Sequence, residues 1–135
     1  MIVIDASSLA KYLLKEQGWS EVETHLELGV ASVDHVIKEV SNAIWKHAVV
    51  RKVIPREKAL EVFKSLLRLV EEGVVVLEDE ERYLAEAFKI SLDADLTLYD
   101  SLYVALALEL GTLLTSDERQ ASIARRLGVE VLYIP

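Results

Sequence analysis

Short apolar runs alternate along this chain with longer stretches in which apolar residues recur at helical spacing. The runs show little polar alternation, which is typical of strands buried on both faces of a parallel sheet. They predict short β-strands at about residues 2–4, 30–31, 74–77, 112–115 and 130–134.

The longer stretches predict α-helices between these strands, because their apolar residues lie three or four positions apart. The expected helices span about residues 5–14, 20–28, 34–51, 55–73, 79–91, 97–110 and 117–127. Residues 93–95 are expected to form a loop, in which Asp93 and Asp95 serve turn chemistry.

Strands that alternate with helices predict an α/β fold. We expect a single domain over residues 1–135, with a mainly parallel sheet of four to five short strands and helices on both faces. In such sheets, ligands bind outside the carboxyl ends of the strands. Asp5 and Asp117 each stand at such an end, so they are the first candidates for a site.

The helices at 34–51 and 55–73 are expected to form a hairpin. Pro55 suits the first position of the second helix. The buried stripe of that helix is predicted to contain Leu60, Phe63, Leu67 and Val70. The hairpin carries further apolar residues, Trp45 and Leu66 among them, and this surplus favours self-association as a homodimer.

The helix at 97–110 is almost wholly apolar. Glu109 is the only charged residue between Ser101 and Leu110, so we expect this helix to be buried on more than one side. Thr97 suits its N-cap, and Asp100 takes the place of the acid in a capping box.

The composition restricts the chemistry of any site. The chain has no cysteine, which excludes disulfides, a thiol nucleophile and a Cys-ligated zinc. Its histidines, His25, His35 and His47, include no pair at the i, i+4 spacing of a helical zinc site. A bound metal would therefore be a hard cation on oxygen ligands, Mg²⁺ or Mn²⁺.

The charge and hydropathy of the chain bear on its partners. The formal net charge of −8 would repel a polyanion, so a nucleic-acid substrate would need bound cations or a local basic patch. No apolar run approaches the roughly 20 residues that cross a bilayer, and the N-terminus lacks the features of a signal peptide. We expect no membrane association and a cytoplasmic location.

Asp5, Glu39, Asp100 and Asp117 each have an ordinary structural explanation. Strand-end caps account for Asp5 and Asp117, a capping box for Asp100, and a solvated helix face for Glu39. Taken together, however, strand ends and neighbouring helices can bring all of these acids to one crevice. Carboxylates so placed repel one another unless divalent cations lie between them, an arrangement that suits metal-dependent hydrolysis of phosphodiesters.

The stretches that carry these acids resemble the successive motifs of PIN-domain nucleases. They read IVIDASS, HVIKEVSNAIW and LYDSLYVALALELGTLLTSDER, occur in the family's order and cover nearly the whole chain. Within the family the chain most resembles the VapC-like ribonuclease toxins of toxin–antitoxin systems.

The resemblance implies that Asp5, Glu39, Asp100 and Asp117 form the catalytic quartet that binds Mg²⁺ or Mn²⁺. Ser7 then occupies a small hydroxyl position after the first acid, and Thr115 a polar position before the fourth. The implied protein is an endoribonuclease that acts on RNA, forms a dimer and is inhibited by an antitoxin protein. The RNA target is left open.

Other functions remain compatible with acids at the ends of parallel strands. A phospho-acceptor receiver and an aspartate phosphatase also use such acids, although the D-x-D pair of the phosphatase would here read Asp5-Ala6-Ser7. A PIN nuclease that processes RNA without being a toxin, and a binding domain without activity, would keep the same quartet.

Several polar residues near these motifs have less specific interpretations. Arg119 could contact substrate or pair with a nearby carboxylate. Asn42 and Lys46 are expected on a solvated helix flank, and the pair Arg125-Arg126 suits a helix C-terminus. His35 and His47 have no evident partner in the sequence and are predicted to be surface or half-buried groups.

Overall fold

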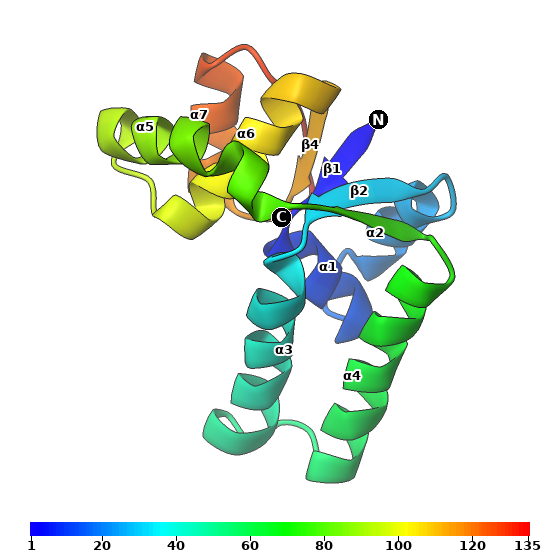
Figure 1. Ribbon diagram of the computed structural model, residues 1–135. Helices are drawn as coiled ribbons and strands as arrows, with labels where there is room; N and C mark the ends of the chain where they lie inside the picture. The colour runs from blue at the N-terminus through cyan, green and yellow to red at the C-terminus, as the bar shows by residue number, and fades with distance from the viewer.

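A five-stranded parallel sheet forms the centre of the structure, a computed structural model that describes residues 1–135 (Figure 1). Its strands lie in the order β3-β2-β1-β4-β5, and every neighbouring pair is parallel. The strands are β1 Ile2–Ile4, β2 Val30–Val33, β3 Val75–Glu78, β4 Thr112–Thr115 and β5 Glu130–Tyr133. The predicted α/β fold and parallel sheet are confirmed.

The strand order reverses between β1 and β4. The chain moves outward from β1 through β2 to β3, and then returns to the other side of β1 to add β4 and β5. A ligand crevice in an open α/β sheet lies at such a reversal, outside the carboxyl ends of the two strands. The order also differs from the 2-1-3-4-5 order of receiver folds, which argues against that alternative.

Helices cover both faces of the sheet (Figure 1). One side carries α1 Ala6–Leu13, α2 Trp19–Leu26, α3 Val36–Trp45 and α4 Arg56–Glu71, and the other α5 Leu84–Ala94, α6 Leu98–Leu110 and α7 Glu118–Arg126. Right-handed crossovers explain this division, because connections that run in opposite directions along the sheet fall on opposite faces. Figure 1 shows α3 and α4 leaving the sheet as the predicted hairpin.

The buried helix of the sequence prediction is α6. Every residue from Ser101 to Ala107 is at most 3% exposed. The helix packs on β1, β2 and β4 with one side and against α5 and α7 with others, so it has little surface left for solvent. Its burial holds Asp100, in its first turn, at a fixed place beside the sheet.

The predicted apolar face of α4 is correct only in part, because Phe63 and Val70 pack against the core but Leu60 and Leu67 do not. Val62 and Leu66 are buried, whereas Leu60 is 55% exposed and Leu67 is 36% exposed. The helix meets the rest of the molecule through a narrow face directed at α1, α3 and β3, because the hairpin stands away from the sheet. Leu66, expected as surplus surface, is therefore part of the core.

Three helix boundaries also differ from the sequence prediction. The helix that follows β2 turns into a π-helix, η1 Lys46–Val50, and a 3₁₀ turn, η2 Glu80–Tyr83, precedes α5. Helix α5 continues through the expected loop to Ala94 and ends at Asp95, whose φ of 54° is a left-handed conformation that aspartate tolerates. Pro55 precedes α4 as its N-cap residue. No helix has the length and hydropathy needed to cross a membrane.

Candidate active site

Asp5 stands at the junction between β1 and α1, where the extended chain turns into a helix. Its carboxylate caps α1 by accepting the Ser8 N–H at 3.0 Å, as the sequence suggested. The side chain is nevertheless 1% exposed, which is unusual for a simple cap. The junction thus places a carboxylate inside the molecule at the carboxyl end of a central strand.

Two hydroxyl groups hold the Asp5 carboxylate. Ser7 Oγ lies 2.7 and 2.9 Å from its two oxygens, and Thr115 Oγ1, at the end of β4, donates to Oδ2 at 2.5 Å. Thr115 Oγ1 also accepts the backbone N–H of Asp117 at 3.0 Å. Thr115 therefore links the first acid to the backbone of the fourth.

Asp117 follows β4 and caps α7. Its Oδ1 accepts the Gln120 N–H at 3.0 Å, and its other oxygen has no hydrogen-bond partner. One oxygen of this carboxylate thus caps the helix, and the other remains available to a ligand.

Asp100 lies in the first turn of α6 without being the cap itself. Thr97 Oγ1 accepts the Asp100 N–H at 3.2 Å, whereas the Asp100 carboxylate accepts no backbone N–H. The predicted capping box is therefore formed on one side only. Burial, followed by the negative charges of Glu39 and Asp117, raises the pKa of Asp100 to about 6.

Glu39 lies on α3 and is held from the opposite helix. The Tyr103 hydroxyl, on α6, donates to Glu39 Oε1 at 2.6 Å, and His35 Nε2 lies 3.4 Å from the same oxygen. Burial and then the Glu39 charge raise the pKa of Tyr103 well above its usual range, so the phenol stays protonated and remains a donor.

The acids Asp5, Glu39, Asp100 and Asp117 line one pocket of about 260 Å³. The other residues that line it are small, namely Ala6, Ser7, Ala10 and Ala43. The pocket lies at the reversal between β1 and β4, where the fold itself places a ligand site. Residues from four separate parts of the chain thus converge as the sequence analysis expected.

Negative charge in this pocket is poorly compensated. Burial raises the pKa of Asp5 to about 7, although hydrogen bonds from Thr115, Ser8 and Ser7 act in the opposite direction. The positive charge of Arg119 lowers the pKa of Asp100, but its effect is smaller than the opposing effects of burial, Glu39 and Asp117. A cation that entered this pocket would favour the ionised form of these acids.

The donor set suits a hard divalent cation. The side chains of the pocket that could ligate an ion offer only oxygen, from four carboxylates and the Ser7 hydroxyl, and Mg²⁺ and Mn²⁺ prefer oxygen ligands. No three of the acids and histidines lie close enough to hold one ion together in this conformation. The oxygens of Asp117, Glu39 and Asp100 that accept no hydrogen bond remain available to an ion.

His35 corrects the sequence analysis, which found no partner for it. The residue is 8% exposed, approaches Glu39, and stacks on Tyr99 with ring centroids 4.6 Å apart and planes 12° apart. Tyr103 was not identified at all. Helical spacing could have indicated both residues, since His35 precedes Glu39 by four residues and Tyr103 follows Asp100 by three, which places each on the same helix face as an acid.

The remaining candidates lie beside the pocket. Arg119 Nη2 donates to the backbone carbonyl of Asp95 at 2.5 Å. The sequence had suggested contact with substrate or with a carboxylate instead. Asn42 and Lys46 are exposed and do not line the pocket, as expected. His47 was also wrongly left without a partner, because its Nε2 lies 3.8 Å from Glu16 Oε2.

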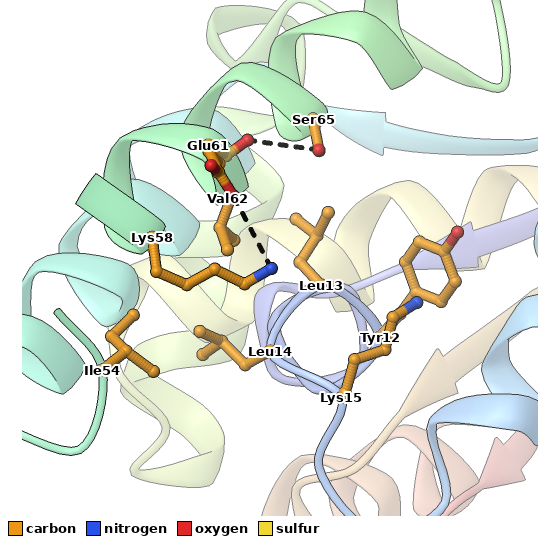
Figure 2. A pocket seen from close by; sticks show the side chains of 9 residues that line it. All are labelled: Tyr12, Leu13, Leu14, Lys15, Ile54, Lys58, Glu61, Val62 and Ser65. Carbon is orange, nitrogen blue, oxygen red and sulfur yellow. Dashed lines mark hydrogen bonds and ion pairs between the residues drawn. The ribbon is translucent and has the colours of Figure 1, made fainter. Parts of the chain in front are cut away.

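A larger cavity of about 350 Å³ lies away from the acids, between the end of α1 and α4 (Figure 2). Leu13, Leu14 and Val62 form much of its wall. Lys58 pairs there with Glu61 at 3.7 Å and Lys15 lies over the Tyr12 ring, so this cavity contains no group of acids. We therefore assign the chemistry to the smaller, acidic pocket.

Comparison with known proteins agrees with this geometry. The sequence profile of the PIN domain matches residues 2–126. The chain belongs to the PIN-domain family. This PIN domain is 28% identical over 121 residues to Ribonuclease VapC3 of Pyrobaculum aerophilum, an alignment that covers 88% of this chain and 90% of that protein.

A solved structure shares the fold of this PIN domain. PAE2754 from Pyrobaculum aerophilum superimposes with a TM-score of 0.67, over 96% of this chain and 89% of the other, at 24% sequence identity. At this identity the likeness establishes the common fold and no more. The resemblance inferred from the sequence motifs is thus confirmed at the level of the family.

Proposed function

We propose that this PIN domain is a Mg²⁺- or Mn²⁺-dependent endoribonuclease and the toxin of a toxin–antitoxin pair. Membership of the PIN family and similarity to a protein named Ribonuclease VapC3 support a nuclease. The observation that carries the proposal is the convergence of Asp5, Glu39, Asp100 and Asp117 on one pocket at the strand reversal.

The four carboxylates would hold the metal. A divalent ion bound there supplies an activated water and neutralises charge on the phosphate that is cut. The protein's own part is to position the ligands: Ser7 and Thr115 orient Asp5, and Tyr103 orients Glu39. Their hydrogen bonds fix ligand geometry before substrate arrives, as outer-shell partners of metal sites do.

The charge of the chain makes the cation necessary for binding as well as for chemistry. The protein carries a net charge of −8, and its pocket adds four carboxylates to the place where a phosphate must lie. RNA would be repelled from this pocket in the absence of divalent ions. Metal dependence of cleavage is therefore expected to be complete rather than partial.

We further propose an antitoxin protein, a homodimer and a cytoplasmic location. An antitoxin segment lying across the acidic pocket would block the reaction. The hairpin exposes Trp45, Val50, Val53 and Leu60, and these apolar side chains support self-association. A neighbouring gene for an antitoxin, and growth arrest relieved by its expression, would distinguish a toxin from a nuclease that only processes RNA.

Cleavage of a panel of structured RNAs tests the proposed activity. The purified protein is expected to produce discrete fragments with Mg²⁺ or Mn²⁺ and none with excess EDTA. Activity that persists in EDTA would contradict metal-dependent hydrolysis. Intact RNA in every metal would favour a binding domain without activity.

Tyr103→Phe should reduce metal affinity and cleavage by roughly tenfold to a hundredfold, the usual effect of losing an outer-shell hydrogen bond. The substitution removes only the hydroxyl that holds Glu39, and the ring continues to fill its place in the core. Mn²⁺ affinity and the melting temperature, Tm, are to be measured together. A large fall in Tm with unchanged Mn²⁺ affinity would show that Tyr103 serves only the fold.

A further inference from the structure

Tyr99 is an exposed aromatic side chain in the first turn of α6, the turn that carries Asp100. It is 56% exposed, and its hydroxyl makes no hydrogen bond in the structure. Exposed apolar residues that are scattered singly over a surface need no explanation. Tyr99 differs from them because it directly precedes Asp100 and its ring rests on a buried histidine that contacts Glu39.

The two rings form a fixed stack. His35 and Tyr99 lie with centroids 4.6 Å apart and planes only 12° apart, and His35 is itself 8% exposed. The imidazole covers one face of the phenol ring, so the exposed area of Tyr99 belongs mainly to the opposite face and the hydroxyl edge. The buried His35 ring therefore holds the exposed face of Tyr99 in one orientation even when no ligand is bound.

Helical register ties this stack to the acids. Tyr99 and Tyr103 lie one turn apart on α6, and His35 and Glu39 lie one turn apart on α3. Tyr99 meets His35 while Tyr103 meets Glu39, so the same two helix faces form both contacts. Tyr99 is therefore held one helical turn from the Tyr103–Glu39 contact, in the turn of α6 that carries Asp100.

A flat aromatic face beside a phosphodiester-cutting pocket matches a nucleobase. Bases of single-stranded RNA stack on aromatic side chains, and this interaction does not depend on protein charge. That independence is needed here, because a chain with a net charge of −8 gains little affinity from phosphate groups.

We propose that Tyr99 is a stacking platform for one base of a single-stranded RNA, adjacent to the phosphate that lies over the acids. The inference rests on the proposed ribonuclease function and adds a base-binding residue to the same site. A base on this platform would position the neighbouring phosphate at Asp100 and Glu39. Base-paired RNA would be a poor ligand, because its bases are already stacked on one another.

Matched substitutions separate aromatic stacking from simple packing. Tyr99→Phe keeps an aromatic face, whereas Tyr99→Leu keeps an apolar group over His35 without a ring. Phe88→Leu is the control, since Phe88 on α5 is 55% exposed and stacks on no ring. The Tm of each variant shows whether it is folded, and Tyr99→Phe serves as the reference if Tyr99→Leu is destabilised.

In the kinetic experiment, Tyr99→Leu is expected to raise KM for a short single-stranded RNA about tenfold, in line with the loss of one base stack. The kcat should stay within about twofold, because the stack contributes equally to bound substrate and transition state. Tyr99→Phe and Phe88→Leu should behave as wild type. Wild-type KM in Tyr99→Leu would overturn the proposal while leaving the nuclease function intact.

A second experiment reads the stack without turnover. An oligoribonucleotide that carries 2-aminopurine is mixed with the protein in Ca²⁺, a hard cation that carboxylates can bind in place of Mg²⁺. Its fluorescence should be quenched by wild type and Tyr99→Phe but not by Tyr99→Leu. Equal quenching by all variants, or none by wild type, would contradict base stacking. If no RNA is cleaved with any metal, the proposed function fails, and this measurement still decides the role of Tyr99.

Discussion

Asp5→Asn is expected to abolish RNA cleavage while the protein stays folded and becomes more stable at neutral pH. Loss of an outer-shell partner alone lowers activity by 10- to 100-fold in metal sites, so removal of a ligand should lower it by at least about 100-fold. Asparagine still caps α1, because its amide oxygen accepts the Ser8 N–H as aspartate does.

The gain in stability has a separate cause. Burial raises the pKa of Asp5 to about 7, which means that the folded state disfavours the ionised carboxylate. A neutral amide avoids that penalty, so Tm at pH 8 should rise by a few degrees. Asp93 is an exposed acid on α5 outside the pocket, so Asp93→Asn is the control. It should change neither RNA cleavage nor Tm. Full activity in Asp5→Asn would remove Asp5 from the proposed centre.

The metal-free protein is expected to lose stability as the pH rises from 6 to 8. Asp5 has a folded pKa near 7 and an ordinary value of 3.8, so the folded state binds more protons than the unfolded state across this window. The shift in Asp100, to about 6, acts in the same direction. Stability that is present at acidic pH is therefore lost as the pH passes through 7.

The Asp5 contribution alone amounts to about 1.4 kcal/mol between pH 6 and pH 8, or a fall in Tm of roughly 5 °C. Mg²⁺ or Mn²⁺ should restore most of this loss at pH 8, since a cation favours the ionised carboxylates. The effect of metal should be smaller at pH 6, where protons compete. Thermal melts in EDTA and in each metal measure both effects; a Tm that rises with pH in EDTA would show that the acids are not clustered as described.

Much of the fold follows from local patterns. The short run Thr112–Thr115, with two leucines at its centre, and the uncharged stretch after Asp100 predicted β4 and the buried α6 within a residue or two. These segments contact protein on several sides, so they contain almost no charged residues, and their sequences alone indicate that they are buried. The face of α4 was not predictable in the same way, because Leu60 and Leu66 are equally apolar and only the position of the hairpin decides which is buried.

Part of the candidate site could also be predicted from the sequence, and part could not. Asp5 and Asp117 follow strands, and their positions at the sheet edge could be expected from parallel topology. The contact of Glu39 with Tyr103 joins α3 to α6, elements separated in the chain by the strand β3 and the helices α4 and α5. Such contacts depend on the relative placement of helices, which no local pattern specifies.

Mn²⁺ binding at pH 8 is the most direct test of the proposed carboxylate centre. Titration of Mn²⁺, followed by the electron paramagnetic resonance signal of the free ion, reports binding without any RNA substrate. Our account predicts binding by the wild-type protein, loss of that binding in Asp5→Asn and Asp100→Asn, and no change in Asp93→Asn. Binding that is absent from wild type, or equally strong in Asp5→Asn and Asp100→Asn, would contradict a metal centre built from these acids.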